Sequence, residues 1–270
     1  MCGKNMLKKT ATRKLYYLSI CLLVLSPVGV KICVGECVRI PTYSMYPTLL
    51  PGDIAWCEKI TYGPILPERI SELPIINLLC FFPFIQQLDK QMAWKRVRLA
   101  GIRPPKRLDV VVFDSPGEQT MLTKRVIGLP GDTFSIQKGK IYINGKRLIQ
   151  LNQDIYCYQT DSITYPKIMR RDWTTTNYGP LIIPYKGMQV PYGKAGVYQE
   201  VIDNEQMKVT IDSLFVFTDD YYFMLGDNGN NSLDSRFIGL IPARNIKGRL
   251  SRVLYSDIAS FRERFLKKID

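Results

Sequence analysis

Apolar residues gather in one long run near the N-terminus, "LYYLSICLLVLSPVGVKICV" at 15–34, which follows the basic segment "KKTATRK" at 8–14. About 20 apolar residues are enough to cross the hydrocarbon core of a bilayer. Positive charge before such a run favours a cytoplasmic N-terminus. The pattern therefore predicts a basic cytoplasmic segment at 1–14 and an uncleaved transmembrane anchor at 15–34. A cleavable signal peptide has the same layout, but no A-x-A-like site ends this run.

A second apolar run, "LPIINLLCFFPFI" at 73–85, contains two prolines. This run is too short to span a bilayer, which needs about 20 residues. Two interpretations stay open for it. The run is either a segment of the protein core or a loop that enters the membrane interface beside the anchor through Phe81, Phe82 and Phe84.

Beyond the anchor, short segments with strand-like patterns alternate with Gly, Pro and Asn. The segment "GKIYINGKRL" at 139–148 predicts a hairpin, because Asn-Gly between two β-rich halves is typical of a type I′ turn. Gly52-Asp53 and Gly131-Asp132 are interpreted as turns that close strands. Further strands are predicted at 109–113, 121–129, 207–212 and 221–225. The predicted fold class is mainly β.

Changes in this pattern suggest the domain organisation. A catalytic β core is predicted at 37–138 and 217–256, with an inserted β-rich subdomain at 139–216, whose stretch 150–206 has no helical period. The tail at 256–270 alone has helical spacing, with Ile258, Phe261 and Phe265 on one face. We expect a solvated terminal helix there, within a basic C-terminal tail at 257–270, rather than a membrane-surface contact.

The absence of histidine from the 270 residues narrows the possible chemistry. It excludes Ser-His-Asp and Cys-His hydrolases and zinc sites built on histidine. The seven cysteines include no CxxC pair, which argues against a zinc ribbon. Cys33 and Cys37 would share one face of a helix and are interpreted as small apolar residues, with their pairing left open. A net charge of +13 suits nucleic acid or phospholipid, and composition does not choose between them.

A serine in the segment "PTYSMYPTLLPGD" at 41–53 is a candidate nucleophile. Without histidine, the plausible activator of Ser44 is a neutral lysine. Its pKa must fall from about 10.4 towards 8, a shift that costs roughly 3 kcal/mol and that burial in apolar surroundings provides. In "MLTKRVIGLPGD" at 121–132, the period of two puts Lys124 on one face with Leu122 and Val126. Lys124 is therefore the candidate base.

Four motifs extend this picture: "PTYSMYPTL" (41–49), "PGDIAWCEKITYG" (51–63), "TKRVIGLPGD" (123–132) and "MLGDNGNNSLDSRFIGLIP" (224–242). Together they closely resemble the sequence boxes of type I signal peptidases, the membrane-bound Ser–Lys endopeptidases. The resemblance implies a signal-peptidase-like β-sheet catalytic domain after the transmembrane helix. The matches cover about a fifth of the chain and frame nearly all of 41–242.

The resemblance implies a role for each matching position. Ser44 matches the nucleophile and Lys124 the general base. Thr42 matches the hydroxyl that forms the oxyanion hole with the Ser44 backbone N–H. Ser232 matches the serine that orients the lysine amine. Structural support of the site is implied for Arg125, Asp227, Asn228, Asp234 and Arg236, with Asp227 or Asp234 expected to pair with Arg125 or Arg236. The sequence departs from the family at Gly229, where arginine is common.

The implied function is that of a serine endopeptidase that cleaves N-terminal signal peptides from exported preproteins. Its Ser–Lys dyad would act at the outer, periplasmic face of the bacterial cytoplasmic membrane, on a single-pass protein with a cytoplasmic N-terminus. The implied partners are preproteins and membrane phospholipid, not nucleic acid, and no cofactor or metal is needed. A peptidase dedicated to one client stays open as an alternative. A self-cleaving repressor or a vestigial binding protein fits less well, because the anchor, Ser44 and Lys124 are all present.

Overall fold

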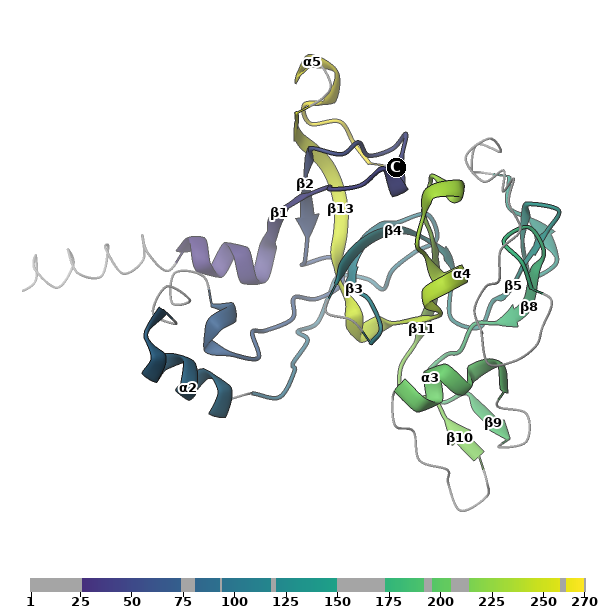
Figure 1. Ribbon diagram of the computed structural model, residues 1–270, viewed down its shortest axis with the longest axis horizontal. Coiled ribbons are helices and arrows are strands. Elements are labelled where there is room, and N and C mark those ends of the chain that lie inside the picture. The colour runs from purple at the N-terminus through teal and green to yellow at the C-terminus, as the bar shows by residue number, and fades with distance from the viewer. Residues whose placement is uncertain are drawn as a thin grey trace, which may run out of the picture.

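The computed structural model describes residues 26–73, 81–92, 94–117, 120–149, 173–191, 196–204, 214–257 and 261–269. A seven-stranded sheet forms the centre of the fold, and its neighbouring strands are antiparallel throughout (Figure 1). In spatial order its strands are β1 (Gly35–Arg39), β2 (Asp53–Glu58), β13 (Ile246–Ser256), β3 (Val110–Asp114), β4 (Met121–Gly128), β11 (Tyr221–Leu225) and β12 (Ile241–Pro242).

A second, four-stranded sheet lies on the side of the long sheet away from β1 and β2 (Figure 1). Its spatial order is β7 (Lys146–Arg147), β6 (Lys140–Ile143), β5 (Thr133–Gln137) and β8 (Tyr178–Ile182). β9 (Gln189–Pro191) pairs with β10 (Leu214–Val216), and α3 (Gln199–Asn204) lies between them in sequence. One apolar cluster joins the two sheets, because Phe223 of β11 stacks on Phe134 of β5 at 4.0 Å between ring centroids. The division into core and insert at 139 stays a prediction.

The long sheet is buried on both faces where the apolar runs cross it. In β3, Val110 and Val112 belong to one buried cluster, while Val111 and Phe113 belong to another. A run of four apolar residues therefore supplies both faces, as expected for a strand inside a covered sheet. β11 is likewise buried along its whole length.

Most strand predictions that fall on the described residues are confirmed. The predicted strands at 109–113, 121–129 and 221–225 correspond to β3, β4 and β11. The 139–148 hairpin is confirmed as well, since Asn144 has φ 52° and Gly145 has φ 75° between β6 and β7. The segment 207–212 lies outside the described residues. The mainly β fold class is confirmed.

Both predicted Gly-Asp turns are confirmed, and they share one geometry. Gly52 has φ +86° and Gly131 has φ +84°, values that suit glycine best. The Asp53 carboxylate accepts the Leu50 N–H at 2.8 Å, and the Asp132 carboxylate accepts the Leu129 N–H at 2.7 Å. The Gly131 turn connects β4 to β5, whereas the Gly52 turn follows η2 and opens β2, so the prediction that it closes a strand is wrong.

The prediction that helical character is confined to the tail is wrong. Only Phe261–Arg264 forms a helix in the described part of the tail (α5), and β13 continues to Ser256. The tail folds back on β13, where the Ile269 N–H donates to the Ser251 carbonyl at 2.9 Å and Ile269 is buried. Arg264 is also buried and pairs with Asp53. These tertiary contacts override the amphipathic spacing. Helices also form at α2 (Pro83–Gln91) and α3.

The predicted anchor falls largely on residues that the structure does not describe. Its last residues form the π-helix η1 (Val30–Val34), which leads into β1. Within the described ranges, no helix has both the length and the apolar character that a membrane span requires. Cys33 and Cys37 are free cysteines, and Cys37 lies on a strand, so the shared helix face predicted for them is wrong.

Candidate active site

Ser44 lies in a short 3-10 turn, η2 (Tyr43–Met45), which follows β1. The turn is held by its apolar neighbours: Met45 and Leu49 are buried in the cluster under β1 and β2. The Leu49 N–H donates to the Met45 carbonyl at 2.9 Å. Ser44 itself stays partly exposed. The apolar residues thus fix the backbone and leave the hydroxyl accessible.

Lys124 lies on β4, paired with Val111 of β3, and only 2% of it is exposed. Its face is apolar as the alternation predicts, since Val126 and Leu122 belong to one buried cluster with β3 and β11. Lys124 Nζ is 2.8 Å from Ser44 Oγ. β4 therefore positions a buried amine within hydrogen-bond distance of the serine hydroxyl.

Burial lowers the pKa of Lys124 from 10.5 to about 8, although the carboxylates of Asp234 and Asp227 act in the opposite direction. With a pKa of about 8, roughly a tenth of the amine is neutral at pH 7. A neutral amine within hydrogen-bond distance can accept the proton of a hydroxyl. The environment of Lys124 is thus suited to a general base.

Thr42 is extended and precedes the turn, with its Oγ1 3.3 Å from Ser44 Oγ. Its hydroxyl therefore lies beside the candidate nucleophile. A hydroxyl in this place is a possible donor to an oxyanion that forms on a carbonyl attacked by Ser44. That role stays a prediction.

The loop after β11 closes the other side of the site. The Asn228 N–H donates to the Ser44 carbonyl at 3.0 Å, and Asn228 Nδ2 donates to the Tyr43 carbonyl at 3.1 Å. A Cβ at Gly226 would lie 2.5 Å from the Ser44 carbonyl oxygen and 2.1 Å from Ser232 Oγ. Glycine is therefore required where this loop meets the serine turn.

Ser232 lies next to Gly226, but its predicted contact with the lysine amine is not made in this structure. Its Oγ is buried and has no hydrogen-bond partner among the described residues. A buried hydroxyl without a partner is rare in folded proteins. The orienting role of Ser232 stays a prediction.

Two buried ion pairs involve residues of this loop, and the expected pairing of an aspartate with an arginine is confirmed in both cases. Arg125 binds Asp227 with Nε–Oδ1 and Nη2–Oδ2 distances of 2.8 and 2.7 Å. Arg236 binds Asp234 through Nε and Nη2, each at 2.8 Å. Such fork-like pairs hold both partners in fixed orientations. The Gly229 carbonyl accepts from Arg236 Nη2 at 2.8 Å, so a backbone group of this atypical position takes part in the network.

Sequence reasoning missed two residues that complete the site. The Thr48 hydroxyl donates to Asp227 Oδ2 at 2.5 Å and thereby connects the serine turn to the Arg125 pair. Gly226 allows the loop after β11 to lie against the Ser44 carbonyl, because it has no Cβ. Both lie inside the quoted motifs, which is the only signal that could have singled them out.

We expect Asp234→Ala to lower the free energy of unfolding by about 3–5 kcal/mol, because Arg236 would keep a buried charge without its carboxylate. Both side chains of this pair are 0% exposed. The matched control is Asp257→Ala, which removes the exposed pair with Arg39 (side chains 41% and 71% exposed) and should cost at most about 1 kcal/mol. Urea unfolding in detergent measures both changes. Equal small losses in the two variants would contradict a supporting role for the buried pair.

A family model described as "Signal peptidase, peptidase S26" matches residues 13–255 of this sequence. The chain belongs to the signal peptidase family. Membership of that family makes it a serine peptidase of the signal peptidase type. The match includes Ser44, Lys124 and the loop with Ser232.

Curated relatives agree with the signal peptidase assignment. The signal peptidase I of Rickettsia typhi is 29% identical over 251 residues, which cover 92% of this chain and 83% of the relative. That of Rickettsia conorii is 30% identical over 239 residues, with 88% and 76% covered. A solved signal peptidase I from Enterococcus faecalis is 24% identical and covers 56% of this chain and 100% of its own, but its TM-score of 0.32 supports no argument.

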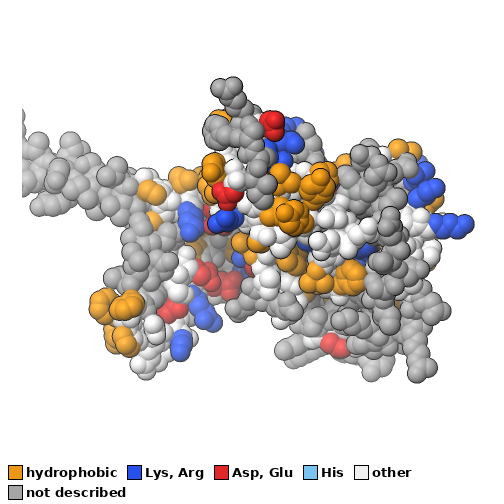
Figure 2. Space-filling view, turned by 45° about the horizontal axis from the view of Figure 1, so that its top comes forward, with side chains coloured by type: hydrophobic (Ala, Val, Ile, Leu, Met, Phe, Trp, Pro, Cys, Tyr) orange, Lys and Arg blue, Asp and Glu red, His pale blue; other side chains and the backbone are white. Residues whose placement is uncertain are grey.

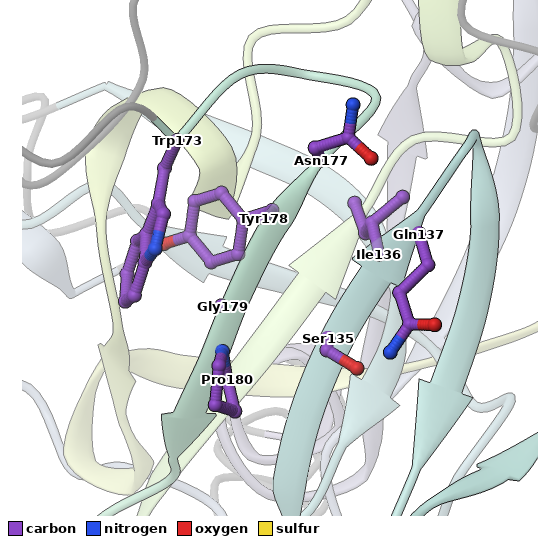
Figure 3. Close-up of a pocket in the computed structure, with 8 residues that line it drawn as sticks. All are labelled: Ser135, Ile136, Gln137, Trp173, Asn177, Tyr178, Gly179 and Pro180. Atoms are coloured by element: carbon purple, nitrogen blue, oxygen red, sulfur yellow. The ribbon is translucent and has the colours of Figure 1, made fainter.

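The signal peptidase chain also has a pocket of about 320 Å³ on the second sheet, between β5 and β8 (Figure 3). Trp173 and Tyr178 face each other at one side of it, with ring centroids 4.7 Å apart. None of its lining residues belongs to the candidate active site, whose base lies on β4 of the seven-stranded sheet and whose nucleophile lies in η2.

Proposed function

We propose that this protein is a Ser–Lys endopeptidase that cleaves N-terminal signal peptides from exported preproteins. The observation that carries the proposal is the 2.8 Å distance between Lys124 Nζ and Ser44 Oγ, with the lysine buried and its pKa lowered to about 8. A buried neutral amine can do the work of histidine, which the sequence lacks.

The reaction begins when the neutral Lys124 amine accepts the proton of the Ser44 hydroxyl as Oγ attacks the scissile carbonyl. The negative charge that develops on the carbonyl oxygen is stabilised by the Thr42 hydroxyl and the Ser44 backbone N–H. The Lys124 ammonium then donates its proton to the leaving amine, and the peptide bond breaks to leave an ester on Ser44. Lys124 next accepts a proton from water, whose oxygen attacks the ester carbonyl. The Lys124 ammonium returns this proton to Ser44 Oγ as the ester bond breaks and the signal peptide is released.

Ser232 is proposed to orient the Lys124 amine during these proton transfers. The support for this role is its position at the contact between the loop and the serine turn, with a hydroxyl that has no other partner among the described residues. The ion pairs of Arg125 with Asp227 and of Arg236 with Asp234 would keep the loop in place.

We place the reaction at the outer face of a bacterial cytoplasmic membrane, with residues 15–34 as a single anchor and a cytoplasmic N-terminus. The apolar run and the basic segment before it support this topology. Family resemblance suggests substrates with small residues at the first and third positions before the cut, bound as an added β-strand. The expected partners are preproteins and membrane phospholipid.

Purified protein in detergent, mixed with several labelled preproteins, tests this function. We expect one cut in each preprotein after a small residue, identified by the mass of the mature product. Ser44→Ala should produce none of these fragments. Failure of the native protein to cut any of the preproteins would contradict the proposal, as would cleavage by the Ser44→Ala variant.

A further inference from the structure

Between Gly63 and Gly101 the chain forms a projection, and we call its described residues, 64–73, 81–92 and 94–99, the arm. The arm is closed at its base, where the Leu99 N–H donates to the Pro64 carbonyl and the Leu66 N–H to the Val97 carbonyl, both at 2.9 Å. A Cβ at Gly63 would lie 2.0 Å from the Leu99 carbonyl oxygen. The outgoing and returning segments of the arm are therefore in direct backbone contact at its base. The base of the arm is thus tightly packed.

A single guanidinium fixes this base to the sheet. Arg98 donates to backbone carbonyls on both sides of the junction, at Tyr62 and Gly63 before the arm and at Ala243, Arg244 and Ile246 next to β13. Hydrogen bonds from a charged donor are stronger than neutral ones. Arg98 therefore helps to fix the arm to the catalytic sheet, and the ion pair of Arg96 with Asp114 of β3 at 3.9 Å is a second contact between them.

The outer end of the arm carries the helix α2, and three aromatic side chains at its start face solvent. Phe81, Phe82 and Phe84 are 87%, 59% and 73% exposed. Asp89 on the helix accepts the Ser71 N–H at 2.8 Å, which ties the helix to the outgoing part of the arm. Figure 2 shows hydrophobic side chains gathered at the end of the molecule where Figure 1 places α2. Clustered exposed aromatics of this kind mark an interaction surface.

The charges around these rings indicate what they contact. The arm has exposed basic side chains at Arg69, Lys90 and Lys95, and none of the three forms an ion pair with another described residue. Its described acidic residues are engaged within the arm: Asp89 and Glu72 each accept a backbone N–H, and Glu68 pairs with Arg96 at 3.4 Å. Exposed rings at the start of α2, with an exposed lysine in its last turn and another after it, suit a bilayer with anionic headgroups. The rings would enter the acyl boundary while the ammonium groups stay among phosphates.

We propose that the arm docks on an anionic phospholipid bilayer through Phe81, Phe82 and Phe84. The arm and η1, which follows the predicted anchor, lie at the same end of the molecule, away from the β5–β8 sheet (Figure 1). The inference rests on the membrane location proposed above. Together with the anchor, the arm provides a second fixed contact and so holds the catalytic sheet in one orientation to the bilayer.

Site-specific photo-crosslinking in the full-length protein tests this docking. The substitution Phe82→p-benzoylphenylalanine is made in protein reconstituted into vesicles that contain radiolabelled phosphatidylglycerol or phosphatidylcholine. Tyr185→p-benzoylphenylalanine is the matched control, because Tyr185 is 48% exposed and follows β8 on the second sheet. Val24→p-benzoylphenylalanine, within the predicted anchor, reports separately whether the chain enters the bilayer.

We expect a lipid adduct at position 82, several-fold stronger with phosphatidylglycerol than with phosphatidylcholine, and none at position 185. Lys90→Glu combined with Lys95→Glu should lower the adduct at position 82 several-fold. A crosslinked dimer without lipid adduct would overturn the proposal, because the rings would then contact a second copy. Absence of any adduct at position 82 would overturn it as well. An adduct at position 82 but not at position 24 would support the arm and contradict the anchor, and preprotein cleavage is scored independently of both.

Discussion

Replacing Lys124 by methionine is expected to lower the rate of signal-peptide cleavage by about 10³-fold or more, because no proton acceptor remains beside Ser44. Methionine has a similar length and suits the apolar environment of β4, where Lys124 is 2% exposed. The loss should appear in kcat rather than in KM, since the lysine acts on the reacting proton and not on substrate binding. Initial rates on a labelled preprotein in detergent measure it.

Two controls separate loss of chemistry from loss of fold. Lys140→Met changes an exposed lysine on β6 and should leave the rate unchanged. Lys124→Met should be more stable than the native protein by up to about 3 kcal/mol at pH 7, because the pKa of Lys124 falls from 10.5 to about 8 on folding. The buried ammonium destabilises the fold below pH 8, and this cost disappears as the pH rises from 8 to 10.5. Full cleavage by Lys124→Met would exclude the lysine as the base.

The Thr42→Val substitution is expected to reduce kcat by about 10²-fold or more, because one donor to the developing oxyanion is lost. Valine has nearly the shape of threonine, so packing around the serine turn should persist. Thr42→Ser retains the hydroxyl and should keep most of the activity. Steady-state rates with a peptide substrate give kcat and KM for the three proteins.

An effect of Thr42→Val on KM rather than on kcat would indicate a role for Thr42 other than oxyanion stabilisation. Its Oγ1 lies 3.3 Å from Ser44 Oγ, so the hydroxyl also has the position to orient the serine. If Thr42→Val raised KM and left kcat unchanged, transition-state stabilisation by this hydroxyl would be excluded. Equal inactivity of Thr42→Ser and Thr42→Val would also count against it.

Local pattern was enough to predict the strands and the buried lysine. The alternation in 121–128 put Lys124 on an apolar face, and the Asn144-Gly145 pair specified the hairpin turn. Both signals are local, since a strand has a period of two and a type I′ turn requires positive φ at adjacent residues.

Elements that depend on distant contacts were not predictable in this way. The amphipathic tail was expected to be helical, but Arg264 instead reaches Asp53 and Ile269 returns to β13. The sequence pattern did not predict α2, because the first residues of this helix continue the apolar run at 73–85. Pro83 does occupy the first helical position, where proline is favourable. Short helices are stabilised mainly by tertiary packing, which the sequence pattern does not reveal.

The choice of ion-pair partners in the site also needed the fold. From the sequence alone, Asp227 or Asp234 could each pair with Arg125 or with Arg236. The pairing of β4 with β11 places Arg125 opposite Leu225, close to Asp227 in the following loop. Arg236 forms its ion pair with Asp234. The Asp234 side chain also caps the N-terminus of the short helix α4 (Ser235–Ile238), which contains Arg236.

The dependence of kcat/KM on pH tests most directly whether Lys124 is the base for Ser44, because it reports the pKa of the essential group in the free enzyme. With a pKa of about 8, kcat/KM should rise about tenfold per pH unit below pH 8 and level off above it, since only the neutral amine accepts the proton. A profile that is already flat above about pH 5 would instead indicate a carboxylate base and contradict the role of Lys124.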